Sequence, residues 1–560
     1  MKIVIIGGVA GGASAAAKAR RLSEDAEIIL FERGEQISFA NCGLPYHIGG
    51  DIQDRDALLI QTPEKMHHRF NIDVRVETEI TDINPAKKTV VAKHTLTGEE
   101  YEETYDRLIL SPGAAPFIPP IEGIESPEVM TLRNMSDMDR ILATLDNTHT
   151  RRAAVIGGGF IGLEMAEALV HRNLSVSLIE QAPQVMAPLD AEMAEPLHDT
   201  LRQQNVDLRL NTGVKRFTLE DRGITLTLMD DSLLKVDLVI LAIGVRPETT
   251  LATSAGLEIG KTGGIAVNRR METSEQDIFA VGDAVEINEF VSGDPALIPL
   301  AGPANRQGRI AAINALGGKA EYRGSQGTAV CKLFDLTVAS TGLNEKALKR
   351  QGTAYEKVYI HANNHAGYYP GASKINFKLL FSSEGKVLGA QATGLSGVDK
   401  RIDVIATAIQ ADLSVYDLEE VELTYAPPYG SAKDVVNYAG FVAANVLNKS
   451  MTQLYSENLP DALEDPQAIL LDVRNPDEIT QSGAIPGSIN IPLDSLRQNL
   501  QQLPKNKTII VYCAVGLRGY LACRVLGQNG YNTRNLAGGY YMWQQSKHCR
   551  PVSNTERKVA

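Results

Sequence analysis

Two of the five cysteines stand in sequence contexts that favour thiol chemistry, and Cys42 is the first of them. It lies in the run Ser-Phe-Ala-Asn-Cys-Gly, and the residues five before and five after it are Ile37 and His47. A disulfide to a near neighbour is therefore excluded, so Cys42 could act only as a single thiol that bonds to sulfur of another molecule. A small buried hydrophobe, the common fate of a free cysteine, is the alternative.

Cys513 follows the apolar segment 507–512 and opens the loop Cys-Ala-Val-Gly-Leu-Arg, which ends at Arg518. A cysteine at the carboxyl end of a strand, in a loop that wraps onto a helix N-terminus, faces several backbone N–H groups. Those donors and the Arg518 guanidinium would stabilise a thiolate or a persulfide anion. A structural cysteine needs neither, so the loop predicts sulfur chemistry.

Two glycine-rich turns indicate dinucleotide binding. Each follows a short apolar strand, precedes a helix, and is followed by a second strand that ends in an acid. Glycines let the backbone approach a pyrophosphate, the helix N-terminus attracts its charge, and the acid can accept from ribose hydroxyls. Two such units about 150 residues apart are far more specific than one. The first contains Gly7, Gly12 and Glu32, with Val9 in place of the middle glycine, and the second contains Gly157, Gly159, Gly162 and Glu180.

The acid of the second unit predicts which nicotinamide cofactor binds. Glu180 would hydrogen-bond the adenosine 2′-hydroxyl and repel a 2′-phosphate, so NADH is expected over NADPH, although the nearby Arg172 does not exclude NADPH. Further along, the short strand 278–281 ends in Gly282 and Asp283. This acid is suited to bind a ribityl hydroxyl of a flavin; an ordinary N-cap aspartate is the alternative.

Composition bounds the remaining possibilities. A chain of 560 residues with 44% hydrophobic and 22% charged residues is a globular protein of several domains. Its net charge of −13 argues against nucleic acid as a partner, but not against local basic patches. The cysteines are too few and too irregular for a disulfide framework or a zinc site, so we expect a cytoplasmic protein without a metal. We predict no membrane span. Cys331 and Cys523 are expected in cores, and Cys549 near an exposed tail.

These motifs resemble known families. From residue 1 to about 446 the chain resembles the pyridine nucleotide–disulfide oxidoreductases, and the Cys42 loop resembles their single-cysteine branch of coenzyme A (CoA)-disulfide reductases, NADH oxidases and NADH peroxidases. The C-terminal part resembles a rhodanese domain, with Ala484 where a histidine is usual. The resemblance implies an α/β protein with two Rossmann-like domains, an α+β dimerisation domain and an α/β rhodanese domain. The expected boundaries are 1–115 with 248–322 for the FAD domain, 116–247 for the NADH domain, 323–446 for dimerisation, 447–460 for a linker and 461–560 for the rhodanese domain.

The resemblance also implies a homodimer and a set of site residues. The partner subunit would bring Tyr368 and Tyr425 to the thiol, with Tyr369 and Tyr429 as near alternatives. FAD is expected at Gly7, Gly12, Glu32, Arg33, Ser111, Gly113, Gly282 and Asp283. CoA is expected at Ser14, Lys18, Arg21, Asn305 and Lys433, with Ser38 and Asn41 lining the thiol end. Ser14, Lys18 and Arg21 share one helix face by spacing, for which a solvated charged face is the alternative.

The predicted reaction is the NADH-dependent reduction of CoA persulfide, polysulfide and CoA disulfide through FAD and Cys42, with sulfane sulfur relayed by Cys513. One alternative is an NADH oxidase or peroxidase that cycles Cys42 through a sulfenic acid. Ala10 stands where such enzymes tend to have histidine, which disfavours it. A non-catalytic redox or sulfane-sulfur sensor is disfavoured by the two intact nucleotide units and by the two loop cysteines.

Overall fold

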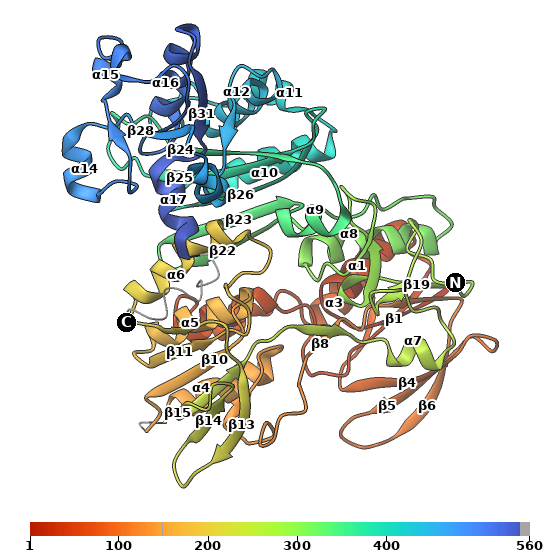
Figure 1. Cartoon of the computed structure of the whole chain (residues 1–560). Coiled ribbons are helices and arrows are strands. Elements are labelled where there is room, and N and C mark those ends of the chain that lie inside the picture. The colour runs from red at the N-terminus through yellow and green to blue at the C-terminus, as the bar shows by residue number, and fades with distance from the viewer. Residues whose placement is uncertain (148, 549–560) are drawn as a thin grey trace. The chain divides into compact units, whose positions relative to one another are not determined.

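The computed structural model describes residues 1–147 and 149–548 (Figure 1). Cys549 and the rest of the predicted tail therefore lie outside the described residues. The chain divides into two compact units, the first made of residues 1–185 and 201–327, the second of residues 186–200 and the chain from 328 onward. Among the described helices, none is both long and apolar enough to cross a membrane.

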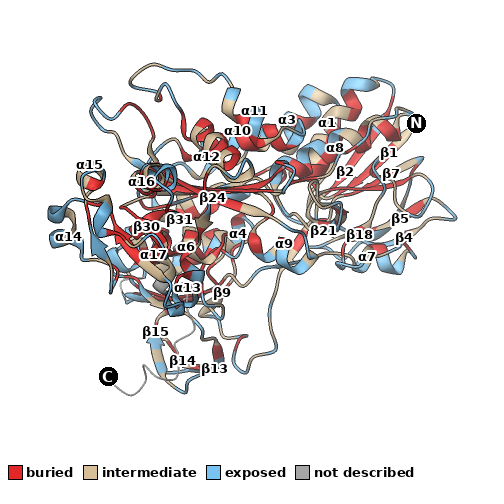
Figure 2. Cartoon of the chain, turned by 45° about the horizontal axis from the view of Figure 1, so that its top comes forward, coloured by how far each residue is buried: buried red, intermediate tan, exposed pale blue. Residues whose placement is uncertain are grey.

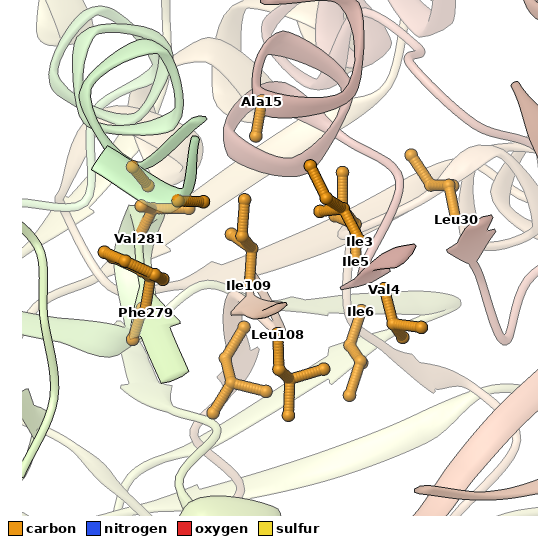
Figure 3. Close-up of a cluster of buried hydrophobic side chains, with 14 of the residues drawn as sticks. Ile3, Val4, Ile5, Ile6, Ala15, Leu30, Leu108, Ile109, Phe279 and Val281 are labelled. Atoms are coloured by element: carbon orange, nitrogen blue, oxygen red, sulfur yellow. The ribbon is translucent and has the colours of Figure 1, made fainter. Parts of the chain in front are cut away.

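The first unit begins with a five-stranded sheet in the order β19-β7-β1-β2-β3, whose paired strands are parallel. Its strands are β1 (Lys2–Ile6), β2 (Glu27–Phe31), β3 (Asp73–Arg75), β7 (Arg107–Leu110) and β19 (Ile278–Ala280). The strands β1, β2, β7 and β19 are mostly buried and β3 at the sheet edge is not, whereas the helices α1 (Ala10–Leu22) and α8 (Ala301–Ala315) combine buried and exposed residues (Figure 2). In Figure 3, Ile3, Ile5 and Ile109 point toward Ala15 of α1, while Ile6 and Leu108 point to the opposite face. Side chains alternate along a strand, so a run without polar residues is buried on both faces.

A second five-stranded sheet repeats this plan in the order β12-β11-β10-β16-β9. It contains β10 (Arg152–Ile156), β11 (Ser175–Ile179), β12 (Asp207–Arg209), β16 (Leu238–Leu241) and β9 (Val129–Met130), with α5 (Phe160–His171) after β10. Each large sheet is accompanied by an antiparallel three-stranded sheet. The first has β4 (Thr78–Asn84), β5 (Thr89–His94) and β6 (Glu100–Thr104), and the second has β13 (Val214–Leu219), β14 (Ile224–Leu228) and β15 (Leu233–Val236). Because the two plans match, the two glycine turns occupy equivalent places.

Smaller elements complete the first unit. Antiparallel β8 (Ala114–Pro116) and β17 (Val245–Pro247) form a ribbon, and β18 (Ile265–Ala266), β20 (Val285–Asn288) and β21 (Pro295–Ala296) form a small sheet. The remaining helices are α2 (Leu44–Gly49), α3 (Pro63–Phe70), α4 (Met135–Leu145) and α7 (Thr250–Ser254). The helix α6 (Ala191–Gln203) begins in the segment that belongs to the second unit.

The second unit is built on two sheets. The first is antiparallel, in the order β22-β23-β26-β25-β24, with β22 (Ala329–Leu333), β23 (Leu336–Gly342), β24 (Glu356–Asn363), β25 (Lys374–Phe381) and β26 (Val387–Gly394). Its helices are α9 (Glu345–Gln351), α10 (Val398–Gln410), α11 (Val415–Glu420) and α12 (Val435–Leu447). Cys331 is buried on β22, as predicted.

The C-terminal sheet is parallel, in the order β27-β31-β30-β28-β29. It contains β27 (Gln453–Leu454), β28 (Ala468–Asp472), β29 (Ile489–Asn490), β30 (Thr508–Tyr512) and β31 (Asn532–Leu536), with helices α13 (Leu459–Glu464), α14 (Pro476–Ser482), α15 (Leu493–Leu496), α16 (Leu517–Gln528) and α17 (Gly539–His548). Cys523 is buried on α16.

The structure differs from the expected organisation at two places. β27 lies within the predicted linker 447–460 and pairs with β31, so the C-terminal sheet starts before residue 461. Residues 186–200 fall inside the predicted NADH domain, yet they pack with the second unit. The boundaries themselves remain predictions.

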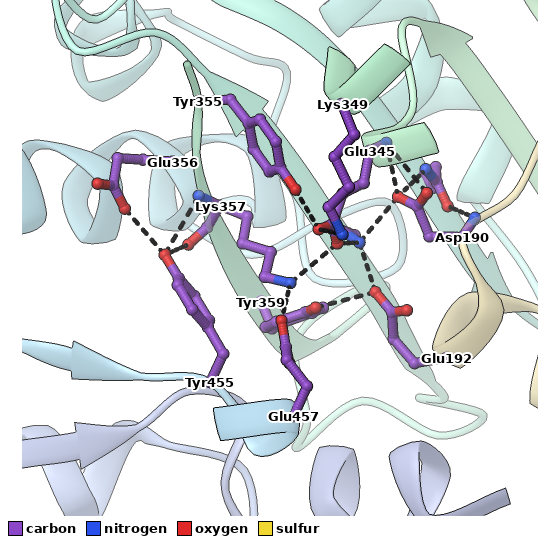
Figure 4. Close-up of polar contacts among 12 residues, drawn as sticks. Asp190, Glu192, Glu345, Lys349, Tyr355, Glu356, Lys357, Tyr359, Tyr455 and Glu457 are labelled. Carbon is purple, nitrogen blue, oxygen red and sulfur yellow. Dashed lines mark hydrogen bonds and ion pairs between the residues drawn. The ribbon is translucent and has the colours of Figure 1, made fainter. Parts of the chain in front are cut away.

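A buried ion network explains the second difference (Figure 4). Lys378 on β25 is fully buried, and its ammonium lies 2.8 Å from Asp190 Oδ2 and also contacts Glu192 and Glu345. Burial alone would lower the pKa of Lys378, but the surrounding negative charges outweigh it and hold that pKa well above its ordinary value. The three carboxylates gather as they would around a metal ion, but the ammonium supplies the positive charge.

Lys357 on β24 extends the network to the C-terminal region. Its ammonium lies 2.9 Å from Glu345 Oε1 and 2.6 Å from Glu457 Oε1. Tyr455, next to β27, donates to Glu356 Oε2 at 2.9 Å. The antiparallel sheet therefore carries the central charges of a network that reaches residues 186–200 on one side and the start of the C-terminal sheet on the other.

Substitution of Lys378 should test this network. Lys378→Met leaves three clustered carboxylates without their cation, and losing one partner of a buried ion pair costs about 3–5 kcal/mol. We expect the thermal unfolding midpoint to fall by several degrees. The control is Lys386→Met, because Lys386 forms an exposed pair with Asp412 at 2.7 Å, of a kind that contributes little. Equal shifts in the two variants would contradict the importance of the buried network.

Candidate active sites

The loop that carries Cys42 is attached to the first glycine turn. Ser38 N donates to Gly8 O at 2.8 Å, and Ser38 adopts a left-handed conformation with φ of 46°. The chain then forms a 3-10 turn over Asn41–Gly43 and enters α2. Cys42 is exposed, so the thiol is not enclosed by packed side chains. This loop therefore presents the sulfur at the carboxyl ends of β1 and β2.

Two acids influence the Cys42 thiol. Although the residue is accessible, partial burial raises the pKa of Cys42, and the charges of Glu164 on α5 and Asp283 raise it further. Burial also raises the pKa of Glu164 to about 7, against the opposing effect of a 3.3 Å hydrogen bond donated by Tyr46 Oη. Glu164 was not among the predicted residues, because nothing in the sequence brings α5 to the Cys42 loop.

Several of the predicted FAD residues contact one another at the first glycine turn. Glu32 Oε2 accepts from Gly8 N at 2.8 Å, and its Oε1 accepts from Gly34 N at 2.9 Å. Gly12 is required because a Cβ there would lie 1.8 Å from Gly7 O. Asp283 is half-buried, and burial raises the pKa of its carboxyl group. No hydrogen bond to that carboxylate is found among the described residues, so it is available to a polyhydroxyl ligand.

The other FAD candidates lie around Arg133, a residue that the sequence did not single out. Arg33 pairs with Glu248 through two contacts of 2.6 and 3.0 Å, and Arg133 lies 3.9 Å from the same carboxylate. A Cβ at Gly113 would lie 3.0 Å from the Arg133 guanidinium. Ser111 and Gly282 face each other closely enough that a Cβ on Gly282 would lie 3.6 Å from Ser111 Oγ.

The predicted NADH residues repeat the arrangement around Glu32. Glu180 accepts from Gly158 N and Ala182 N, both at 2.7 Å. A Cβ at Gly162 would lie 1.9 Å from Gly157 O, whereas a Cβ at Gly159 would meet no atom within 4 Å. Gly162 is therefore needed for packing, while Gly159 leaves open space over the turn, where a pyrophosphate could approach. Both turns fit the dinucleotides expected of them.

A basic cluster accompanies the first turn. Ser14 Oγ donates to Asn305 Oδ1, which joins α1 to α8. Partial burial and the charges of Arg309 and Arg21 lower the pKa of Lys18. Three positive side chains from two helices therefore lie close together, and Arg309 on α8 was missed because its helix is distant in sequence. Such a cluster suits a phosphate-bearing ligand.

The remaining CoA and tyrosine candidates lie on the second unit. Tyr368 and Tyr425 are 77% and 49% exposed, and their hydroxyl oxygens lie 3.2 Å apart. Tyr369, Tyr429 and Lys433 are also exposed. The structure thus brings the two predicted tyrosines together, while their approach to a thiol across a subunit interface remains a prediction.

Cys513 occupies a different environment. It is only 1% exposed, and its Sγ accepts from Gly516 N at 3.1 Å, ahead of α16. Arg518 makes two 2.6 Å bonds to Glu478, and these bonds lower the pKa of Glu478 to about 2. The Arg518 guanidinium also interacts with Cys513. The pKa of Arg518 is raised by Glu478 first and by Cys513 as well. Glu478, absent from the predicted set, therefore holds Arg518 at the loop.

The fold and the sites together define a dinucleotide-dependent oxidoreductase. Among the cysteines that the structure describes, Cys42 is exposed, whereas Cys513 lies in a second, buried loop. Residues 1–308 match the pyridine nucleotide-disulphide oxidoreductase family, residues 328–434 its dimerisation domain and residues 456–546 the rhodanese-like domain. The chain belongs to the pyridine nucleotide-disulphide oxidoreductase family. This confirms the predicted fold class, the enzyme class and the cofactors FAD and NADH, whereas the roles of individual residues stay predictions.

Several named relatives are similar over most of the chain. A coenzyme A disulfide reductase of Staphylococcus aureus is 37% identical over 79% of this chain and 99% of its own. The crystal structure of reduced Bacillus anthracis CoADR-RHD is 51% identical, with a TM-score of 0.95 over 97% of this chain and 98% of that one. An NAD-dependent persulfide reductase from A. fulgidus is 37% identical, with a TM-score of 0.91 over 97% and 100% of the two chains.

The acids around Cys42 give a testable pH dependence. In Glu164→Gln the negative charge that raises the pKa of Cys42 is removed, so that pKa should fall and the thiolate should form at lower pH. The rate of Cys42 alkylation by iodoacetamide, followed against pH by peptide mass spectrometry, should shift to lower pH by several tenths of a unit or more. Glu125→Gln, at an exposed acid of the same unit, serves as the control. An unchanged profile in Glu164→Gln would show that Glu164 does not act on the thiol.

Proposed function

We propose that this protein uses NADH to reduce CoA persulfide, CoA disulfide and polysulfide, and that Cys42 is the thiol that bonds to the substrate sulfur. The observation that carries the proposal is the accessible, solitary Cys42 on a loop anchored to the first dinucleotide turn. The relatives named coenzyme A disulfide reductase and persulfide reductase support both substrate classes.

The chemistry follows from a single thiol. With CoA disulfide, the Cys42 thiolate attacks one sulfur, forms a Cys42–CoA mixed disulfide and releases one CoA thiolate. With CoA persulfide, it attacks the outer sulfur, forms a Cys42 persulfide and releases the CoA thiolate. NADH and FAD, when bound at the two glycine turns, would supply the two electrons that restore the Cys42 thiolate, so that the second CoA thiolate or hydrosulfide leaves.

In this proposal, separate groups of residues would bind the phosphates and the thiol end of CoA. Lys18, Arg21 and Arg309 would hold the phosphates of CoA, with Ser14 and Asn305 beside them, and Lys433 stays a predicted CoA contact. Ser38 and Asn41 would line the thiol end, where Asn41 Nδ2 donates to Arg133 O at 3.2 Å. The dimerisation domain match supports a homodimer, in which Tyr368 and Tyr425 would reach the partner's thiol.

Cys513 would supply sulfane sulfur. Its thiolate attacks a persulfide R–S–SH, takes the outer sulfur and releases the thiol R–SH, and a CoA thiolate then removes that sulfur as CoA persulfide. The Gly516 N–H and the Arg518 guanidinium would stabilise the anionic sulfur. The rhodanese-like match over residues 456–546 supports this role.

NADH consumption with CoA persulfide should separate the two cysteines. Cys42→Ser should lose nearly all activity, about a hundredfold or more, because no thiol remains to form the mixed sulfur bond. Cys513→Ser should retain activity with free CoA persulfide but lose it with polysulfide or larger sulfane donors. Equal rates in wild type and both variants would refute the scheme, and NADH turnover driven by peroxide without CoA would favour an oxidase or peroxidase.

A further inference from the structure

Two residues of the antiparallel sheet reach the helix that follows the C-terminal sheet. His361 on β24 and Asn376 on β25 are register partners, and His361 Nδ1 lies 2.9 Å from Asn376 Oδ1. Asn376 Nδ2 donates to Tyr541 Oη of α17 at 2.8 Å. The His361 and Tyr541 rings also pack edge to face, with centroids 4.9 Å apart. One polar chain therefore runs from β24 through β25 to α17.

The backbone of α17 supports the loop that carries Cys513. Tyr541 N donates to Ala514 O at 3.0 Å, and Tyr540 N donates to Cys513 O at 2.8 Å. Gly539 permits this approach, because a Cβ there would lie 2.4 Å from Cys513 O. A shift of Tyr541 would therefore move the Ala514 carbonyl and, through the adjoining backbone, the Gly516 N–H that donates to the sulfur.

The hydrogen-bond directions show what His361 contributes. Asn376 Nδ2 donates to Tyr541 Oη and Asn376 Oδ1 faces His361 Nδ1, so in this arrangement His361 Nδ1 carries the hydrogen and donates it to Oδ1. Burial lowers the pKa of His361 to about 4, so the imidazole is neutral at pH 7. Its Nε2 is then an acceptor, buried without a hydrogen-bond partner. Burying an acceptor without a partner is unfavourable, and an apolar side chain at position 361 would avoid this. The feature of His361 that an apolar residue could not supply is the donor at Nδ1.

We propose that His361 and Asn376 are positioning residues for sulfur transfer at Cys513 and that they act through Tyr541. This inference rests on the proposed role of Cys513 as a sulfur carrier. It makes the sulfur loop dependent on side chains outside the predicted rhodanese domain. Sulfur transfer would then require the contact between the antiparallel sheet and α17, and not the C-terminal sheet alone.

The test uses the full chain with thiosulfate as sulfur donor and cyanide as acceptor. The Cys513 thiolate takes the outer sulfur of thiosulfate and releases sulfite, and cyanide then removes that sulfur as thiocyanate. Tyr541→Phe and Asn376→Ala should each lower kcat about tenfold, as expected for one lost hydrogen bond, with KM for thiosulfate changed less than twofold. Asn376→Asp should restore most of kcat, because its carboxylate accepts from both His361 Nδ1–H and Tyr541 O–H. NADH-dependent CoA disulfide reduction should stay unchanged.

Tyr455→Phe is the matched control. It also removes a tyrosine hydroxyl that bonds to the antiparallel sheet, at Glu356, but none of the described hydrogen bonds joins Tyr455 to the Cys513 loop. Its thiocyanate formation should stay within twofold of wild type. Unchanged kcat in Tyr541→Phe, or an equal loss in Tyr455→Phe, would overturn the inference.

A second measurement separates this inference from the proposed function. If wild type forms no thiocyanate, the carrier role of Cys513 fails, and the positioning role is then judged by the rate at which iodoacetamide alkylates Cys513. That rate should change several-fold in Tyr541→Phe and not in Tyr455→Phe. Equal alkylation rates in all three proteins would overturn the positioning role as well.

Discussion

The backbone of Gly8 is the constraint on which the Cys42 site depends. Its N–H donates to Glu32, and its carbonyl accepts from Ser38, where the Cys42 loop begins. A Cβ at Gly8 would lie 2.7 Å from Ile37 Cγ2, so a larger residue would force the turn and the loop apart. Because one residue joins both, the position of the thiol is set by the same turn that is predicted to bind FAD.

Glu32 and Glu180 each hold a glycine turn and can also take the ribose-binding role predicted for them. Each carboxylate already accepts two backbone N–H bonds, one from the glycine turn and one from the loop after its own strand. A carboxylate oxygen has further lone pairs, so a ribose hydroxyl can be added without breaking these bonds. The acid therefore holds the turn in shape before any ligand arrives, and ligand binding pays little for reorganisation.

Sequence reasoning predicted the features that arise from neighbouring residues. The apolar strands, the glycine turns, the acids and the two cysteine loops follow from short patterns, and the structure has each element in the expected order. Sequence reasoning could not predict Glu164 beside Cys42, Arg309 beside Lys18 or the carboxylates around Lys378, because those contacts join segments that are distant in the chain. β27 was missed for another reason: two residues are too short to show the alternation that marks a strand.

The two cysteines of the predicted sites have opposite surroundings, and the contrast matches the role proposed for each. Cys42 is accessible, and partial burial together with two nearby acids raises its pKa. Cys513 is buried, its Sγ accepts from Gly516 N, and the Arg518 guanidinium that Glu478 holds in place lies near it. A site that receives a whole CoA substrate needs access, whereas a site that stores one sulfur atom needs protection from water and from other thiols. The burial of Cys513 and the exposure of Cys42 therefore fit the proposed division between sulfur storage at Cys513 and sulfur reduction at Cys42.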